Sequence, residues 1–260
     1  MKFQFSGATI RPYYPPEEGI ILIGLGTIIN AGAIVVGSLL GLLLKNALPQ
    51  RISDTLTKAI GICVLFIGLS GALQNMFTVE DGALSVGGTM MTIFSFIGGS
   101  ILGGALDLEG RLERFGVWLR KRAGADGDSG FLNAFLTASL TVCIGAMAVV
   151  GAINDGLFGD ISLLVTKSIL DAIIIMVMSA TMGKGCIFSA IPVAIFQGLV
   201  TLFARFLQPI MTAQATSNLA LTGSILVFCV GVNLIWDQQR LKVANMLPTL
   251  IFAVALAFVL

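Results

Sequence analysis

The chain has 260 residues, of which 56% are hydrophobic and 11% are charged, and its formal net charge is +1. Its mean hydropathy of +0.97 lies outside the range of soluble globular domains and is typical of proteins that cross a membrane several times. The near-zero net charge argues against a nucleic-acid partner, and the lack of histidine excludes histidine-based acid–base, nucleophilic and metal chemistry.

The cysteine and glycine patterns narrow the class further. The four cysteines are isolated, so we expect neither a disulfide framework nor a metal site, and no cofactor-binding fingerprint is present. Gly37 and Gly41, like Gly99 and Gly103, are four residues apart, the spacing that lets helices approach closely in lipid. Such glycine-rich faces serve packing within one bundle or association into a homo-oligomer.

Residues 1–19 read as a polar tail without helical periodicity, and residues 20–260 as a single transmembrane domain. The predicted fold is all-α, a polytopic membrane helix bundle of seven or eight transmembrane helices. Hydropathy places the spans at about 20–44, 59–77, 84–106, 131–153, 161–182, 186–207, 217–236 and 243–260.

The main polar segment between the spans is 107–130. Within it Leu108, Leu112, Phe115 and Leu119 repeat at helical spacing beside five arginines and lysines, as in a basic amphipathic helix on a membrane surface. We expect this loop to anchor the topology at the cytoplasmic face. The alternative is a binding site for anionic lipid or a protein partner.

The lysines and arginines outside the spans divide unevenly between the two sides. If the eight spans alternate in direction, one side carries three of these residues and the other carries eleven. By the positive-inside rule, the side with eleven is cytoplasmic and both termini lie outside. The sequence therefore predicts a multi-pass protein of the cytoplasmic (inner) membrane with an external N-terminal tail.

The fifth predicted span carries two opposite charges. Lys167 and Asp171 are four residues apart, so on a helix they share one face and can pair. Each costs about 2.5–3.5 kcal/mol near the bilayer centre on the insertion scale, so the helix is only marginally favourable in lipid. Charges kept at this cost are functional by default, and the structural alternative is a self-neutralised pair that fixes helix packing.

Other polar residues are predicted at matching depths. Asn30 and Asp171 each lie about ten residues, or about 15 Å, inside spans that start from the same side, so we expect them to meet near the midplane. Gln197, in the next span, is also at mid-depth. A polar turn is predicted before the charged span, at the external entrance to this midplane site. Its acidic and amide residues, which we expect to surround that outer mouth, are Asn154, Asp155 and Asp160.

Two hairpin loops indicate an inverted repeat. Each places a base four residues before a proline, Lys45 before Pro49 and Arg205 before Pro209, and then enters a glycine-containing span. Since the predicted topology puts the first loop inside and the second outside, helices 1–3 and 6–8 would be inverted copies. Such repeats are typical of secondary transporters, although two apolar sequences can also match by chance.

Two protease-like patterns lack their catalytic partners. The run from Gly68 to Gly71 matches the GxSG element of rhomboid intramembrane proteases, which need a histidine to activate the serine, and this chain has none. Aspartyl intramembrane proteases need two deep aspartates, and only Asp171 is deep. We therefore expect no enzyme activity.

Several short sequences together resemble one bacterial family. They are GTIINAG at 26–32, GAM at 145–147, DGLFGD at 155–160, TKSILD at 166–171 and FSAIP at 188–192. These are similar to the family called domain of unknown function 554, the YdfK/YqgA-like membrane proteins, over about residues 20–260. The resemblance implies an integral inner-membrane protein, often regarded as a transporter, without an established substrate. It also implies a shorter N-terminal tail, as a mis-assigned start codon would explain.

Two hypotheses of function follow. In the first, the protein is a secondary transporter or channel for a small polar solute or ion. Asp171 then binds the coupling cation or proton, Lys167 supplies the opposing charge, and Asn30 and Gln197 provide neutral hydrogen bonds. In the second, it is a non-transporting scaffold or sensor subunit whose basic helix binds lipid or a partner. The expected partners are membrane lipids, the solute or ion, and a second copy of the chain, with no nucleic acid.

Overall fold

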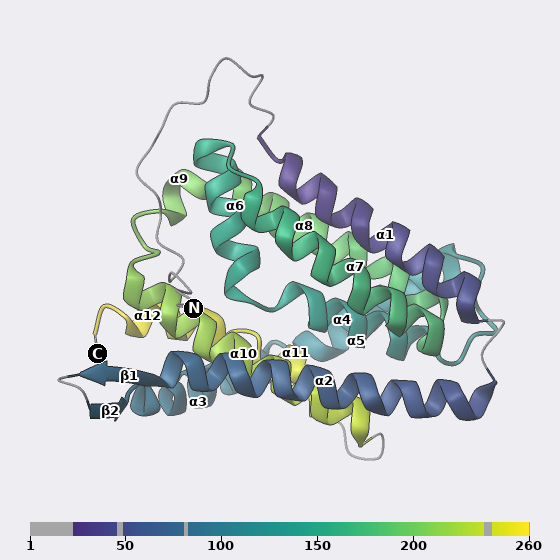
Figure 1. Cartoon of the computed structure of the whole chain (residues 1–260), viewed down its shortest axis with the longest axis horizontal. Helices are drawn as coiled ribbons and strands as arrows, with labels where there is room; N and C mark the ends of the chain where they lie inside the picture. Colours follow the sequence, from purple (N-terminus) through teal and green to yellow (C-terminus); the bar gives the residue numbers. More distant parts are fainter. Residues whose placement is uncertain (1–22, 46–48, 81–82, 237–240, 260) are drawn as a thin grey trace, which may run out of the picture.

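The computed structural model describes residues 23–45, 49–80, 83–236 and 241–259, and in them the chain is a bundle of helices with one small hairpin (Figure 1). The predicted all-α bundle is therefore confirmed. The predicted polar tail, 1–19, lies outside the described residues. The longer helices are α1 (Leu25–Lys45), α2 (Gln50–Met76), α3 (Thr89–Ala105), α4 (Leu108–Arg122), α5 (Phe131–Cys143), α6 (Ala146–Phe158), α7 (Ser162–Met182), α8 (Ala190–Leu202) and α10 (Ala213–Ile235).

Shorter elements connect or end these helices. They are the antiparallel hairpin β1 (Phe77–Glu80) and β2 (Ala83–Val86), the 3-10 helix η1 (Lys184–Ser189), and the helices α9 (Ala204–Leu207), α11 (Val243–Met246) and α12 (Thr249–Leu256). By length and composition, five of the described helices can cross a membrane, or up to seven if each of two bent helix pairs forms one span.

Two long helix pairs form the frame of the bundle. Helix α1 packs along α7, and α2 packs along α10 at the opposite side of the molecule (Figure 1). In the first pair, Gly37 and Gly41 lie against the backbones of Ala172 and Met176. The residue numbers of the contacting pairs increase together along both helices, so α1 and α7 run parallel. Glycine permits this approach because a Cβ atom would overlap the neighbouring backbone.

The second pair uses glycine in the same way. Gly61 lies against Gly231 and Gly68 against Phe228, so these contacts advance in opposite directions and α2 and α10 are antiparallel. Between α3 and the C-terminal helices, Gly99 and Gly103 meet the backbones of Thr249 and Asn245, respectively. The predicted packing role of both four-residue glycine pairs is confirmed.

The span predicted at 131–153 is broken into two helices. The helices α5 and α6 are bent by 62° at Ile144 and Gly145. Gly145 has φ 154° and ψ 145°, a conformation that residues with a Cβ atom rarely adopt. Hydropathy missed the break because the residues on both sides of it are apolar.

The span predicted at 243–260 is also interrupted. The helices α11 and α12 are short, and Pro248, which has no N–H to donate, lies between them. The hairpin includes residues that were predicted to lie in membrane spans. They are 77, expected to end the second span, and 84–86, expected to begin the third. Helix α2 begins at Gln50, nine residues before the predicted start, because its first turns are polar but still helical.

Candidate functional site

The site begins with the charged pair on α7. Lys167 and Asp171 are 7% and 5% exposed, respectively, and the Lys167 ammonium donates a hydrogen bond to the Asp171 carboxylate. It also donates to the backbone oxygen of Val142, at 2.8 Å. The predicted pairing of these charges is therefore present, and the lysine has a second partner on another helix.

This second partner belongs to the helix break. Val142 lies in the last turn of α5, where carbonyl groups have no partner within the helix and carry the negative end of the helix dipole. The Lys167 ammonium satisfies one of these carbonyls. The first N–H groups of α6, which carry the positive end of a second dipole, lie on the other side of Gly145. The break thus places the end of α5 against the charged pair, while the start of α6 borders the same cavity as that pair.

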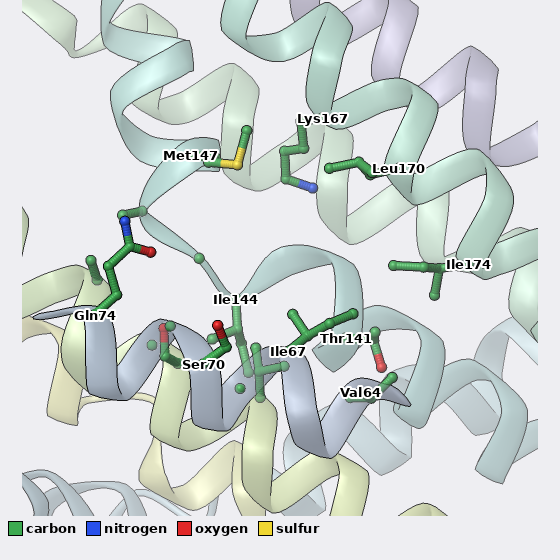
Figure 2. A pocket seen from close by; sticks show the side chains of 18 of the residues that line it. Val64, Ile67, Ser70, Gln74, Thr141, Ile144, Met147, Lys167, Leu170 and Ile174 are labelled. Atoms are coloured by element: carbon green, nitrogen blue, oxygen red, sulfur yellow. The ribbon is translucent and has the colours of Figure 1, made fainter. Parts of the chain in front are cut away.

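A cavity of about 660 Å³ opens at this break, between the two long helix pairs (Figure 2). It is bordered by α2 and α10 on one side, by α7 on the other, and by the α5–α6 break. This volume lies within the range of small-molecule binding sites. The walls are mostly apolar, and the polar side chains among them include those of Ser70, Gln74, Thr141, Lys167, Asp171 and Ser224.

The other two predicted central residues join the charged pair. The Asn30 side-chain amide donates to the Gln197 side-chain oxygen at 3.3 Å, and both residues are almost fully buried. Asn30 also lies within hydrogen-bonding reach of the Asp171 carboxylate. The four residues therefore form one connected series, from Lys167 through Asp171 and Asn30 to Gln197, contributed by α7, α1 and α8.

The predicted depths are only partly right. Asn30 is in the second turn of α1, about 7 Å from its first residue, whereas Asp171 is in the third turn of α7, about 13 Å from its start. The two helices begin at nearly the same level, since Gly26 packs against Leu164, so the contact between Asn30 and Asp171 is a diagonal one between their side chains.

The predicted outer-mouth residues are separated by the structure. Asn154 and Asp155 lie inside α6, so the polar turn expected there is wrong and begins only at Gly159. Asp155 is fully buried, and its carboxylate accepts hydrogen bonds from the backbone N–H groups of Gly24 and Gly26, each at 3.1 Å. It caps the start of α1 and does not line an open mouth.

Asp160 does lie in a turn, as predicted. It precedes α7 and accepts hydrogen bonds from the Ser162 backbone N–H at 3.0 Å and from the Ser162 hydroxyl at 2.6 Å. Among the described residues, no three cysteine, aspartate or glutamate side chains are grouped so that they could hold a metal ion. The chemistry of the site is therefore that of one ion pair, two amides and two helix ends.

The predicted amphipathic helix is confirmed as α4. Asp107 caps it by accepting from the Gly110 N–H, Leu119 faces the protein, and Arg122 lies over the ring of exposed Trp118 at 5.7 Å. Glu109 connects α4 to α11, since its carboxylate accepts from the Ala244 N–H at 2.9 Å. Burial raises the pKa of the Glu109 carboxyl above its ordinary value.

Sequence reasoning missed the Val142 carbonyl, the Gly145 break and the α2 wall of the cavity. Backbone groups leave no mark in the side-chain pattern, so Val142 had no signal. Gly145 did have a signal, because a glycine within an apolar run often marks a break, and the run at 145–147 is also one of the sequences that resemble the family.

Comparison with known proteins gives a family but no activity. The family described as "Protein of unknown function (DUF554)" matches residues 25–258. The chain is 27% identical over 235 residues to the uncharacterized membrane protein YdfK of Bacillus subtilis (strain 168), which covers 90% of this chain and 96% of that protein. It is 26% identical over 240 residues to the uncharacterized protein YqgA of Escherichia coli (strain K12), with the same two coverages. No solved structure matches the chain.

Proposed function

This chain belongs to the DUF554 family of proteins of unknown function, and we propose that it is a secondary transporter or channel that moves a small polar solute or ion across the cytoplasmic membrane. It is a multi-pass membrane protein with several apolar helices of spanning length. The observation that carries the proposal is a buried Lys167–Asp171 pair that borders a cavity at a broken helix. Discontinuous helices with charged groups at the break are how many transporters build their substrate and ion sites.

The energetics of the pair support this function. A lysine and an aspartate in the apolar interior are expensive, and replacing a buried ion pair by apolar residues often costs nothing in stability. Packing of α1 on α7 is already provided by Gly37 and Gly41, so the pair is not needed to hold these helices together. In our proposal Asp171 binds a proton or a coupling cation, and Lys167 exchanges between Asp171 and an anionic group of the solute.

The distribution of charge supports the orientation. Lys45 lies at Gly183, next to Lys184, so the α1–α2 and α7–η1 connections are at one end of the molecule. We assign this end to the cytoplasm by the positive-inside rule and the start of α1 to the outside. We retain the inverted relation of the predicted spans 1–3 and 6–8 within this proposal. In the structure these spans correspond to α1, α2 and α3 and to α8, α10 and α11–α12, respectively. The inverted relation is supported by the contacts of α1 with α8, α2 with α10 and α3 with α12.

The proposal is tested by charge translocation in proteoliposomes. Wild type and Asp171→Asn are challenged with amino acids, polyamines, carboxylates and simple ions, with and without a proton gradient. We expect a current for one solute class that Asp171→Asn abolishes, while Asp126→Asn, the same change at an exposed position, keeps it. Electroneutral exchange is covered by uptake of the same solutes in radiolabelled form.

A second measurement separates transport from the scaffold function. Cysteine replaces Ser70 or Ser224, which border the cavity, and is challenged with a membrane-impermeant maleimide. If a cysteine reacts with the maleimide but no solute is transported, the cavity is open to water but transport is not supported. If no solute moves and neither cysteine reacts, the transporter proposal is wrong, and a scaffold that uses basic α4 to bind anionic lipid or a partner replaces it. In either case we propose no enzyme activity.

A further inference from the structure

A second polar feature runs along the contact between α1 and α8. The Asn30–Gln197 hydrogen bond fixes the register of these antiparallel helices. Thr27 lies one turn before Asn30, and Thr201 lies one turn after Gln197, so the two threonines are at the same level and on the same faces. One turn in the other direction, Ile34 and Val193 share an apolar cluster, as this register requires. We call the four residues Thr27, Asn30, Gln197 and Thr201 the polar seam.

Each member of the polar seam has a polar atom without a protein partner. Among the described residues, no protein group makes a hydrogen bond with the Thr27 and Thr201 hydroxyls, the Asn30 side-chain oxygen or the Gln197 side-chain nitrogen. All four residues are at most 7% exposed. Buried polar groups almost always have a partner, and in proteins a group that lacks one is typically satisfied by ordered water.

The polar seam joins two carboxylates. At one end Asp155 caps α1 at Gly24 and Gly26, directly before Thr27, and its neighbour Asn154 has a further buried oxygen without a partner. At the other end Asn30 lies against Asp171. From Gly26 to Asn30 the helix rises by about 6 Å, so the distance to be bridged is short.

We propose that a file of buried water molecules occupies the polar seam and is the route by which a proton reaches Asp171 from the end of the molecule where α1 begins. The presence of the water follows from the unmet polar atoms, whereas its role rests on the function proposed above. Water suits the seam better than a metal cation, because the Gln197 side-chain nitrogen is a donor while the other three atoms can accept. Water can serve both kinds of group, but a cation can serve only acceptors.

The groups that face Asp171 are compatible with this route. Its charged neighbour on α7 is Lys167, and the thiol of Cys143 on α5 lies close to both. From α1 it meets the neutral amide of Asn30. No other described residue is placed against Asp171 with a charge, so beyond Asp155, which stands at the start of the seam, a proton that travels along it meets no other described carboxylate before Asp171.

The water file is tested by radiolytic hydroxyl-radical footprinting of the full-length protein, in which irradiated bound water oxidises the side chains beside it. We expect oxidation within 27–34 and 193–201 in the wild type. It should fall several-fold in Thr27→Val/Thr201→Val, which removes both hydroxyls at nearly constant volume. Thr27→Ser/Thr201→Ser keeps the hydroxyls and should retain the oxidation, which controls for a fold that merely loosens.

Each result of the footprinting experiment supports or overturns the proposed water file. No oxidation of these segments in the wild type overturns the proposal, and a higher melting temperature of the valine variant would then mean that the hydroxyls are buried dry. Oxidation that persists in the valine variant overturns the assignment of the threonines. If the valine variant does not fold, each threonine is replaced singly and read in the same way. The function proposed above is judged separately, by the current that depends on Asp171.

Discussion

The two long helix pairs on either side of the cavity are built alike and differ in chemistry. Both α1–α7 and α2–α10 bring glycine against a neighbouring backbone. Yet α1–α7 contains a buried ion pair and an amide with an unmet oxygen, while the buried Asn218 and Thr222 of α10 bond to protein groups. The glycine pattern therefore reports only packing. Buried polar groups without a protein partner distinguish the pair to which we assign the proposed function from the pair that forms a wall.

The largest effect should come from breaking the ion pair. Lys167→Met leaves the Asp171 charge and the Val142 carbonyl without their partner, so we expect the free energy of unfolding to fall by about 3–5 kcal/mol. SDS titration in mixed micelles measures this change. The double variant Lys167→Met/Asp171→Leu should recover most of the stability without transport. A double variant that transports normally would show that the pair is structural.

The next effect compares the glycine contacts of the two long helix pairs, α1–α7 and α2–α10. Gly41→Ala places a Cβ atom against the Met176 backbone, and Gly68→Ala places one against Phe228, so each should destabilise its pair by about 1–3 kcal/mol. Gly32→Ala is the matched control in α1, since nothing lies within 4 Å of its Cβ position. It should stabilise the helix by about 0.5–1 kcal/mol. Equal changes in thermal stability at all three positions would contradict the assigned glycine contacts in the two helix pairs.

The helix caps allow a similar comparison. Helix α1 is capped by Asp155 from α6, whereas α10 is capped by its own Thr212, whose hydroxyl accepts from the Ala215 N–H at 3.1 Å. Asp155→Ala should cost about 1–2 kcal/mol, and Thr212→Ala about 1 kcal/mol. Hydrogen exchange locates the loss. The first variant should expose amides in both α1 and α6, but the second only those at the start of α10.

The smallest effect concerns Glu109, which connects α4 to α11 beside the α2–α10 wall. Burial raises the pKa of its carboxyl above the ordinary 4.5, so the folded protein keeps the proton at pH values where the unfolded chain releases it. The free energy of unfolding should therefore be highest below pH 4.5 and fall as the pH rises to the folded-state pKa. Glu109→Gln should flatten this part of the stability–pH curve. An unchanged curve would assign the dependence to another group.

The central residues were predictable because side-chain chemistry and helical spacing place them. Lys167 and Asp171 follow from their four-residue separation, and Asn30 follows from its place on a helix of the same direction, although its depth was only partly right. The break at Gly145 and the cap formed by Asp155 were not predictable in this way. The first depends on one backbone conformation within an apolar run, and the second joins groups 131 residues apart.

This last separation has a consequence for how the protein is made. At synthesis rates of about 5–20 residues per second, Asp155 appears roughly 7–26 s after Gly24. During that time α1 is in the membrane with neither its cap nor its packing partner α7, and the glycine face and Asn30 must be sheltered by the insertion machinery or by lipid. Helix α1 is thus synthesised early but completed late, and a chain that stops before Asp155 leaves it without a cap.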